Sequence, residues 1–418
     1  MKKNIWILNH YATGMFFSKG GRHYWFAKFL KREGYEPVIF CCNTKHGVLE
    51  HYFDIDQLWI ENIAEDIDVP FVVVESSLYK GNGKDRVLNM IRFYRNVQKA
   101  AKEYVKTHEK PDVIYASSVH PLTLVAGIKL ARYFGVKCIC EIRDLWPLSL
   151  VEYGYLKENS LLTKVLYKGE RWIYENADEI IFTGGGLRDY ISEHNWSKTI
   201  PNFKLHYINN GVDLTAFDNN KDCYQIKDSD IINKSVFKVI YAGSIRKVNN
   251  LGLLLDVAKK IKNKRVLFLI WGDGDEKDAL MKRVYEEKIE NIKFKGKVAK
   301  KYIPYITSCA DLNIAHCNPS KLFRFGISFN KIFEYFAAGK PILCDFECRY
   351  NPVIMMNAGM EISNPTPEKV ARTIDSISMM EKGIYEKYCY NARKAAKQYD
   401  FASLTKELCK VIEVAVVE

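Results

Sequence analysis

Residues 328–341 read SFNKIFEYFAAGKP and predict a helix that runs directly into a strand. The apolar side chains recur at the spacing of one helix face, and they are Phe329, Ile332, Phe333, Phe336 and Ala337. We expect Gly339 to end the helix and Pro341 to open the strand. The other face of the helix would then carry Lys331, Glu334, Tyr335 and Ala338, away from the core.

Outside this stretch, short apolar segments alternate with longer helical patterns through nearly the whole chain. In the first half the predicted strands are residues 5–8, 38–41, 71–74, 113–116, 138–142, 179–183 and 205–208. The predicted helices there include residues 21–33, 84–107, 122–134 and 161–176. In the second half the predicted strands are residues 236–242, 266–271, 292–294, 312–315 and 341–344. This alternation predicts an α/β fold in which helices cover both faces of parallel sheets.

The predicted elements form two groups, so we expect two doubly wound, Rossmann-like domains. The first would cover residues 1–212 and the second residues 236–400, with a polar linker at residues 213–235. The sequence leaves open to which domain the final helix, residues 401–418, belongs. Ligands of open α/β sheets bind beyond the carboxyl ends of the strands, and we therefore expect a site in a cleft where the two domains face each other.

The composition is that of a soluble enzyme with anionic partners. The chain has 418 residues, 48% of them hydrophobic, and a formal net charge of +12. A basic balance favours nucleotides, nucleic acid or acidic lipid headgroups, but no nucleic-acid-binding module is recognisable. Eleven cysteines without a C-x-x-C pair argue against a zinc ribbon and for a reducing compartment. With no signal-peptide core or membrane-spanning run, we expect a cytoplasmic protein.

The start of the 328–341 helix is a candidate anion site. Ser328 and Asn330 are possible caps, and the first backbone N–H groups of a helix attract anions. One turn further on, the Glu334 carboxylate can accept hydrogen bonds from two vicinal ribose hydroxyls. From the residues alone, it can equally be a solvated ion-pair partner of Lys331.

This segment resembles the hallmark N-K-x-x-E-Y-x-A-x-G-K-P of the family 4 glycosyltransferases, which have the GT-B fold. The resemblance implies that Glu334 binds the ribose of a nucleotide-sugar donor. The segment Arg143-Asp144-Leu145-Trp146-Pro147 is similar to the R-D-L-W-P signature of family members that assemble bacterial polysaccharides such as capsule and O-antigen. The resemblance therefore implies a retaining glycosyltransferase of cell-surface polysaccharide synthesis, of hexosyltransferase type.

Several residues that follow predicted strands of the first domain are further candidates. Gly20 and Gly21 resemble the glycine loop of the family, although a helix-entry turn explains them equally well. Arg143 and Asp144 could orient hydroxyls of the acceptor or the donor sugar, or they could form an ion pair at the strand end. His120 is a weaker candidate for the same task.

The predicted opening of the second domain carries candidates for the diphosphate. Tyr241-Ala242-Gly243-Ser244-Ile245 looks like the first strand and turn of the nucleotide-binding domain, and Arg246 and Lys247 follow directly. These two cations, with Lys331, could neutralise a diphosphate leaving group. Gly272-Asp273-Gly274 resembles the family's G-D-G turn. Asp273 and Asp275 also form a D-x-D pattern, but it recurs by chance elsewhere in the chain, so we predict neither a metal nor a cofactor.

The sequence departs from the family pattern at three positions. The first glutamate of the common E-x7-E motif would fall at Gly326, so backbone groups around Gly326 and Ser328 would have to replace it. The usual arginine and lysine of the G-R-x5-K motif would fall at Ser244 and Asn249. The transferred sugar and the groups that neutralise the diphosphate therefore cannot be inferred by analogy.

The expected partners are a nucleoside-diphosphate sugar and a glycan or lipid-linked glycan acceptor. Residues 84–110 contain eight Lys or Arg and three Asp or Glu beside an apolar stripe. They are either a basic helix that lies on an anionic membrane from the cytoplasmic side or an ordinary outer helix of the domain. Two rival functions stay open, namely a nucleotide-sugar 2-epimerase of similar fold and a non-catalytic nucleotide-sugar-binding protein.

Overall fold

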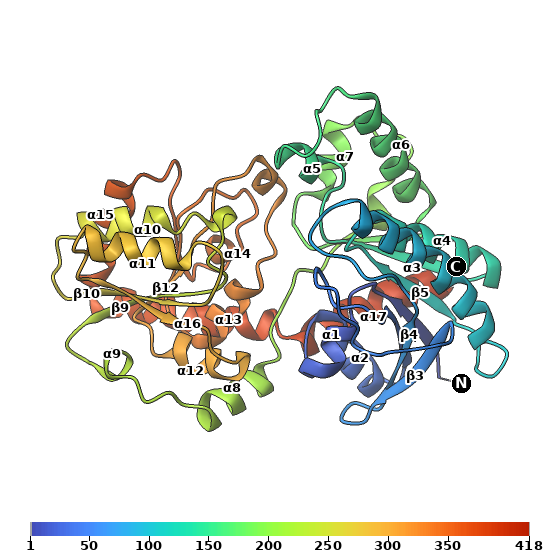
Figure 1. Cartoon of the computed structure of the whole chain (residues 1–418), viewed down its shortest axis with the longest axis horizontal. Coiled ribbons are helices and arrows are strands. Elements are labelled where there is room, and N and C mark those ends of the chain that lie inside the picture. The colour runs from blue at the N-terminus through green and yellow to red at the C-terminus, as the bar shows by residue number, and fades with distance from the viewer. Residues whose placement is uncertain (1, 418) are drawn as a thin grey trace. The chain divides into compact units, whose positions relative to one another are not determined.

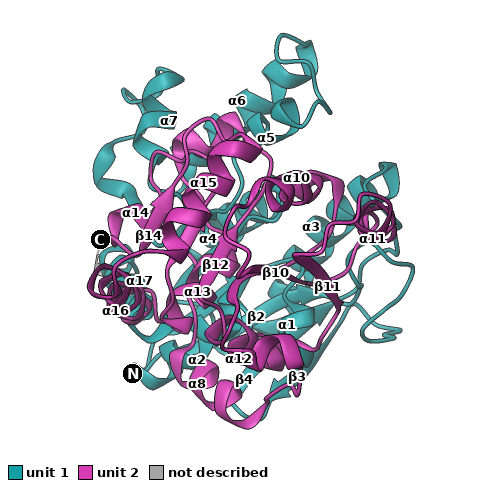
Figure 2. Ribbon diagram, turned by 90° about the vertical axis from the view of Figure 1, so that its left-hand side faces the viewer, with its two compact units in different colours: residues 1–209, 401–418 teal, residues 210–400 magenta. Residues whose placement is uncertain are grey.

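The computed structural model describes residues 2–417, with the side chain of residue 417 left aside. The chain divides into two compact units, shown in two colours in Figure 2. Unit 1 contains residues 1–209 and 401–418, and unit 2 contains residues 210–400. Each unit has its own sheet, so the prediction of two parallel α/β domains is confirmed.

Unit 1 is built on an eight-stranded sheet of order β3-β4-β2-β1-β5-β6-β7-β8. Its strands are β1 Asn4–Leu8, β2 Glu36–Cys42, β3 Trp59–Ala64, β4 Val69–Val74, β5 Val113–Ser117, β6 Lys137–Ile142, β7 Glu179–Phe182 and β8 Leu205–Tyr207. All neighbours pair in parallel except the edge strand β3, which pairs antiparallel to β4. The prediction missed β3 because polar residues interrupt it, a pattern that suits a strand at an exposed edge.

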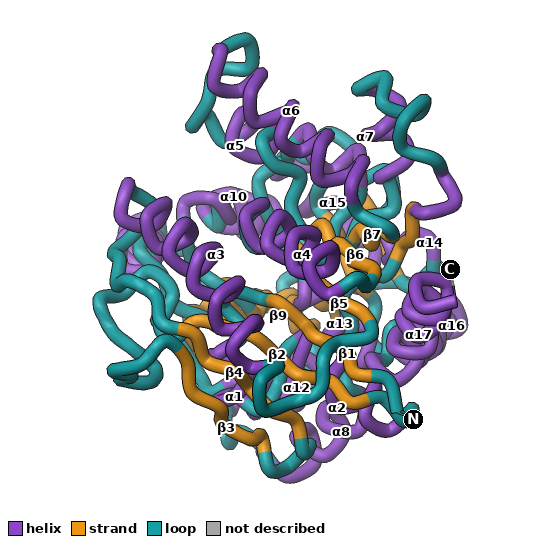
Figure 3. Tube along the Cα trace, turned by 90° about the vertical axis from the view of Figure 1, so that its right-hand side faces the viewer, coloured by secondary structure: helices purple, strands orange, loops and turns teal. Residues whose placement is uncertain are grey.

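Helices cover both faces of the unit 1 sheet (Figures 1 and 3). They are α1 Thr13–Ser18, α2 Arg22–Arg32, α3 Lys84–Tyr104, α4 Pro121–Phe134, α5 Leu148–Glu152, α6 Leu161–Asn176, α7 Leu187–Glu193 and α17 Phe401–Val417. Helices α3 and α4 pack side by side over one face, and α2 and α17 pack together on the other. Parallel strands such as β1 and β5 are buried on both faces, which explains their unbroken apolar sequences.

Unit 2 is built on a six-stranded, fully parallel sheet of order β11-β10-β9-β12-β13-β14. Its strands are β9 Phe237–Ala242, β10 Val266–Trp271, β11 Ile292–Gly296, β12 Leu312–Ala315, β13 Ile342–Cys344 and β14 Gly359–Glu361. Its longer helices are α8 Leu214–Cys223, α10 Gly252–Lys260, α11 Lys277–Glu286, α12 Ile303–Ser308, α13 Asn330–Ala338, α15 Pro367–Ser378 and α16 Lys382–Gln398. The short elements are α9 Ser229–Ile232, α14 Pro352–Met355 and the 3-10 turns η2 Lys247–Asn249, η3 Lys300–Tyr302 and η4 Lys321–Phe325, with η1 Asn202–Lys204 in unit 1.

The predicted linker at residues 213–235 is wrong, because these residues fold as part of unit 2. The Asp213 carboxylate accepts a hydrogen bond from the Ala216 N–H at 2.7 Å and caps α8. The Asp228 carboxylate caps α9 in the same way. The chain passes between the units at residues 209–210 and again at 400–401, and the second crossing places the C-terminal helix α17 in unit 1. Polar helices such as α8 and α9 lack the apolar periodicity on which the prediction relied.

Candidate functional site

The carboxyl end of β9 and the first turn of α13 meet in unit 2. A Cβ atom added to Gly243, directly after β9, would lie only 3.3 Å from Lys331 Nζ and 2.9 Å from the Tyr241 hydroxyl. The neighbouring turn is equally close, because a Cβ at Gly272 would overlap the Gly243 carbonyl oxygen. Glycine at position 243 therefore allows the main chain to approach Lys331, and glycine at position 272 allows the next turn to pack against Gly243.

Contacts with two strands fix the position of α13. The Tyr335 hydroxyl accepts a hydrogen bond from the Ala242 N–H at 3.1 Å and lies 3.4 Å from the Ile314 carbonyl oxygen. Tyr335 is fully buried, so its predicted place on the outer face of the helix is wrong. A tyrosine can enter the core here because its hydroxyl pairs with the main chain of the sheet.

The start of α13 also differs from expectation. Phe329 is the N-cap residue, and no side chain caps the helix, so neither Ser328 nor Asn330 does so. Ser328 instead binds the turn that opens unit 2, where its hydroxyl lies 3.3 Å from the Asn210 N–H and its carbonyl oxygen accepts from the Asn210 amide at 2.9 Å. A helix start without a side-chain cap leaves its first N–H groups available to an anion.

Lys331 is a cation in a poorly hydrated position. Its Nζ lies 4.4 Å from the centre of the Tyr241 ring and 3.4 Å from the Tyr241 hydroxyl, which itself donates to the Ser244 carbonyl oxygen at 2.9 Å. Burial lowers the pKa of Lys331 to about 8, although Cys317 and Asp345 favour its charge. An anion bound beside Nζ would therefore meet a charge that water solvates little.

Glu334 lies one turn after Lys331 on α13. Its side chain is 23% exposed, and its nearest cation is Lys300 Nζ at 3.9 Å. Burial raises the pKa of the Glu334 carboxyl, against the opposing effect of Lys300 and Lys331. Within residues 2–417, Glu334 does not form the ion pair with Lys331 that the sequence left open as an alternative. The carboxylate keeps the capacity to accept hydrogen bonds from hydroxyl groups.

The two positions where the family carries Arg and Lys bind each other in this chain. The Asn249 amide donates to the Ser244 hydroxyl at 2.8 Å and to the Ser244 carbonyl oxygen at 2.7 Å. Arg246 and Lys247 stand between them in the sequence, and both side chains are exposed. Within residues 2–417 neither cation has a carboxylate partner, so both are available to an anionic ligand.

Gly326 occupies a conformation that disfavours a glutamate. It has φ 98° and ψ 174° at the end of the 3-10 turn η4. Residues with a Cβ atom rarely adopt this backbone conformation, which is largely restricted to glycine. The departure at Gly326 therefore follows from the backbone of this loop.

A buried ion pair that was not predicted from the sequence lies at the ends of β12 and β13. The His316 Nδ1 contacts the Asp345 carboxylate, and Nε2 donates to the Asn250 carbonyl oxygen at 2.9 Å. Burial disfavours the imidazolium, but Asp345 and the Asn250 carbonyl outweigh it and raise the pKa of His316. The second carboxylate oxygen of Asp345 has no hydrogen-bond partner within the described residues. The signal available in the sequence was a polar residue directly after each strand.

The segment at residues 272–276 forms a turn that packs on the end of β9. The Ile245 N–H donates to the Asp273 carbonyl oxygen at 2.9 Å, and a Cβ at Gly274 would lie 2.1 Å from the Ile245 carbonyl oxygen. The Asp273 side chain lies 3.5 Å from Lys277 Nζ. Within residues 2–417 no group of three or more His, Cys, Asp or Glu side chains is arranged to hold a metal ion.

In unit 1 the polar centre is Glu141, which the sequence analysis did not single out. Its buried carboxylate lies 2.6 Å from Arg22 Nη2 and accepts from the Ser117 hydroxyl at 2.8 Å and from the Tyr115 hydroxyl. The Asn9 amide donates to His23 Nδ1 at 2.8 Å, so Nε2 carries the proton that points to Glu141 at 3.1 Å. Burial would raise the pKa of Glu141, but Arg22 and His23 hold it well below its usual range.

The Arg22 guanidinium extends this network to the end of unit 1. It donates to the carbonyl oxygens of Asn209 at 2.6 Å and Ile208 at 2.8 Å. Arg22 follows Gly21, which has φ 113° and whose Cβ would lie 2.9 Å from Met15 Cγ. The positive φ at position 21 therefore favours glycine there, whereas Gly20 is not among the glycines with a positive φ. The glycine pair begins α2 and places Arg22.

His120, Arg143 and Asp144 lie at the ends of adjacent strands in unit 1. His120 Nε2 lies 2.6 Å from His10 Nδ1, and burial with Arg86 lowers the pKa of His120 to about 3. His120 is therefore neutral and can offer hydrogen bonds but no charge. The Arg143 N–H donates to the Ser118 hydroxyl at 2.9 Å, and Asp144 is exposed. Within residues 2–417 the predicted alternative of an Arg143–Asp144 ion pair is not found.

The structure thus divides the predicted residues between two places. In unit 2 it brings Lys331 to the end of β9, with Glu334 one turn further along α13, and Ser244, Arg246 and Lys247 lie in the loop that follows that strand. In unit 1 it gathers His120, Arg143 and Asp144 at the ends of β5 and β6. Their predicted roles in binding stay predictions.

Comparison with known proteins shows which family the chain resembles in each half. Residues 24–216 match the family described as Glycosyltransferase Family 4, and residues 225–398 match the family described as Glycosyl transferases group 1. The chain belongs to the family 4 glycosyltransferases. A curated relative is the probable glycosyltransferase WbjE of Pseudomonas aeruginosa, 23% identical over 280 residues. The match covers 64% of this chain and 66% of WbjE, just under two thirds of that relative.

Solved structures show the fold of this glycosyltransferase to be GT-B. Sucrose-phosphate synthase from Thermosynechococcus elongatus has a TM-score of 0.70 and 14% identity, with 99% of each chain covered. HepE of Anabaena, solved in complex with UDP, has a TM-score of 0.66 and 14% identity, covering 99% of this chain and all of that one.

Proposed function

We propose that this protein transfers a sugar from a nucleoside-diphosphate sugar to a hydroxyl group of a glycan or lipid-linked glycan. The placement of Lys331 and Glu334 on successive turns of α13, beside the glycine turn after β9, carries the proposal. A phosphate can meet the Lys331 ammonium and the open helix start, while ribose hydroxyls meet the Glu334 carboxylate. The relatives agree with such a donor, since HepE was solved with UDP.

The reaction that suits these groups is transfer with retention of the anomeric configuration. The bond between the anomeric carbon and the donor phosphate oxygen breaks, and the acceptor oxygen bonds to that carbon on the same face. The acceptor proton passes to the departing phosphate oxygen, so no protein nucleophile is required. Lys331, Arg246 and Lys247 would stabilise the charge that develops on the diphosphate.

We assign orientation of the hydroxyls to residues of unit 1. His120 is neutral and can donate or accept a single hydrogen bond, and Arg143 and Asp144 supply charge-assisted ones. With no obligatory metal or cofactor, the cations of unit 2 have to provide the whole charge stabilisation. The pathway we propose is assembly of a cell-surface polysaccharide such as capsule or O-antigen, at the cytoplasmic face of the membrane. Within residues 2–417 no helix is long and apolar enough to cross that membrane.

The donor site is tested by the contribution of the ribose hydroxyls to binding. A thermal-shift series with UDP, GDP and ADP identifies the base, because a ligand bound to the folded state raises the melting temperature. The preferred nucleotide is then compared with its 2′-deoxy form by calorimetry. Hydrogen bonds to a charged group contribute about 1.5 to 3 kcal/mol, so the wild type should prefer the ribonucleotide about 10- to 100-fold.

The matched variants decide whether Glu334 makes that contact. Glu334→Gln should bind the ribo- and deoxynucleotide almost equally. Glu386→Gln, an exposed helix carboxylate in the same unit, should keep the wild-type preference. Equal preference in wild type and Glu334→Gln would remove Glu334 from the ribose site.

A nucleotide-sugar 2-epimerase of similar fold is the rival enzyme. An epimerase converts the donor without an acceptor, whereas a transferase releases nucleoside diphosphate only when an acceptor is supplied. Acceptor-independent conversion of the donor, followed by proton NMR, would therefore favour the epimerase. Binding without any turnover over a range of acceptors would favour a binding protein.

A further inference from the structure

Helix α6 of unit 1 has two faces with different surroundings. Its inner face is buried, with Thr163, Ile173 and Tyr174 packed in the unit. The Ser160 hydroxyl accepts from the Thr163 N–H at 3.2 Å, which fixes where the helix begins. The residues of the inner face pack α6 against the unit, so the residues of the outer face do not contribute to its core.

The outer face of the first turns is apolar and open. Leu161 is 79% exposed, Leu162 57% and Val165 55%. Tyr155, in the loop before the helix, is 68% exposed. Isolated exposed apolar residues are ordinary, but several on adjacent positions mark a surface that meets a partner. We call Leu161, Leu162 and Val165 the α6 patch.

Three lysines surround the α6 patch. Lys164 and Lys168 lie on the same helix and Lys157 in the loop before it, and all three are exposed. Within residues 2–417 none of them has an ion-pair partner. The carbonyl oxygen of Lys157 accepts from the Thr163 hydroxyl at 2.8 Å, so the loop is held against the start of α6. Of the acidic residues near the patch in sequence, Glu158 is exposed, Glu170 is buried and Glu175 pairs with Arg171.

Helix α3, for which the sequence left a membrane helix and an ordinary outer helix both open, uses its apolar stripe differently. Val97, Ala101 and Tyr104 are buried against the rest of unit 1, as in an ordinary outer helix. Val87 and Leu88, 53% and 59% exposed, lie at its first turn. The exposed Lys84 adjoins that pair, but three exposed apolar side chains with three unpaired lysines lie on and just before α6, where helices α5 to α7 project from the body of unit 1 (Figures 1 and 3).

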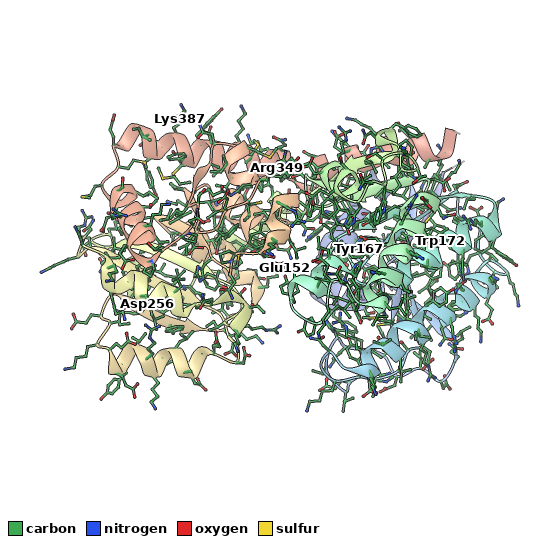
Figure 4. All side chains as sticks on the ribbon, turned by 90° about the horizontal axis from the view of Figure 1, so that it is seen from above. Glu152, Tyr167, Trp172, Asp256, Arg349 and Lys387 are labelled. Carbon is green, nitrogen blue, oxygen red and sulfur yellow. The ribbon has the colours of Figure 1, made fainter. Side chains whose placement is uncertain are left out.

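We propose that the α6 patch docks this protein on an anionic lipid surface. Leu161, Leu162 and Val165 enter the boundary between headgroups and acyl chains, and the lysines contact the acidic headgroups. An acidic protein surface would satisfy the lysines but leave three apolar side chains of a convex helix without a pocket. Tyr167 and Trp172, labelled in Figure 4, continue α6 beyond the patch. The docking does not depend on which sugar is transferred, and it would bring the enzyme to lipid-linked acceptors.

Vesicle flotation of the full chain tests this docking. We expect binding to vesicles of equal parts phosphatidylcholine and phosphatidylglycerol at low salt and little binding to phosphatidylcholine alone. Serine at Leu161, Leu162 and Val165 together should reduce the bound fraction at least about tenfold. Reversal of Lys157, Lys164 and Lys168 to glutamate should do the same and remove the dependence on salt.

A second pair of substitutions separates α6 from α3. Val87→Ser with Leu88→Ser removes two exposed apolar side chains from α3 and should leave flotation unchanged. Loss of binding in this α3 variant with normal binding of the α6 variant would overturn the proposal, as would a wild type that does not float. A wild-type dimer that the α6 substitutions turn into a monomer, without lipid binding, would assign the patch to a second copy.

The donor site provides the control for folding and for the proposed function. Every variant should keep the wild-type thermal shift with the preferred nucleotide. Wild-type flotation with no nucleotide binding would contradict the proposed transferase and leave the docking intact. Normal nucleotide binding without flotation would contradict the docking alone.

Discussion

The ammonium group of Lys331 lies 4.4 Å from the centre of the Tyr241 ring. This contact holds a cation over an aromatic face at the carboxyl end of β9, where water is largely excluded. The electrostatic attraction of the ring offsets part of the cost of burial. The remaining cost appears as the lowered pKa of Lys331, about 8.

Nucleoside-diphosphate binding should weaken as the pH rises above about 8. The protonated form of Lys331 binds the anion, and above its pKa the free protein loses that form, so affinity should fall about tenfold per pH unit. Calorimetric titration from pH 6.5 to 9.5 measures this. Lys331→Arg, whose charge persists at these pH values, should flatten the profile, and Lys277→Arg should retain it. A wild-type profile that is flat to pH 9.5 would contradict the role of Lys331.

Breaking the pair of His316 and Asp345 should destabilise the protein. Asp345→Asn leaves a buried imidazole without its partner, at a cost of about 3 to 5 kcal/mol in the free energy of unfolding. The folded pKa of His316 is raised, so the stabilisation is complete below about pH 6.5 and is lost as pH rises through the folded value. Urea denaturation at pH 6 and pH 9 should therefore show the larger effect at pH 6. A larger loss at pH 9 would disagree with a charged His316.

Replacement of Gly326 by alanine should cost about 1 to 3 kcal/mol, because the added Cβ atom disfavours the backbone at φ 98°. Chemical denaturation measures the change. Gly383→Ala is the matched control, since Gly383 lies in the first turn of α16 with room for a Cβ atom. That control should leave stability unchanged or raise it by up to about 1 kcal/mol. Equal effects at the two glycines would show that the backbone at residue 326 is relaxed.

Glu170→Gln should remove a pH dependence of stability. The buried Glu170 carboxyl is bound by the hydroxyls of Tyr174 at 2.7 Å and Tyr190 at 2.6 Å, and burial raises its pKa to about 8. The folded state then holds a proton that the unfolded state releases above about pH 4.5, so wild-type stability falls as pH rises from there to about 8. The fall is about 3 to 5 kcal/mol at most. Melting curves of both proteins from pH 5 to 9 should converge at low pH and separate at high pH.

Local sequence predicted the principal strands and helices well. Buried parallel strands such as β1 and β10 are continuous apolar segments, and helices such as α13 carry a clear apolar stripe. The edge strand β3 and the polar helices α8 and α9 were missed, because exposed elements do not need an apolar face. The linker at residues 213–235 was wrong for the same reason.

The candidate site was predictable where a motif was local and unpredictable where distant residues meet. Glu334 and Lys331 belong to one motif, and the sequence alone placed both on one side of a helix. The pairing of Ser244 with Asn249 and of His316 with Asp345 joins residues from separate turns or strand ends. No local pattern specifies such partners.

The sequence by itself determined the two α/β domains, the glycosyltransferase family and the place of the helix α13, since each follows from periodicity or from a contiguous motif. Only the tertiary structure decided that Tyr335 is buried and that Glu141 is the polar centre of unit 1. It alone also decided that Leu161, Leu162 and Val165 on α6 are exposed, whereas Val97, Ala101 and Tyr104 on α3 are buried. The physical reason is that burial depends on which segments pack together, and a side chain's pKa and exposure follow from those neighbours.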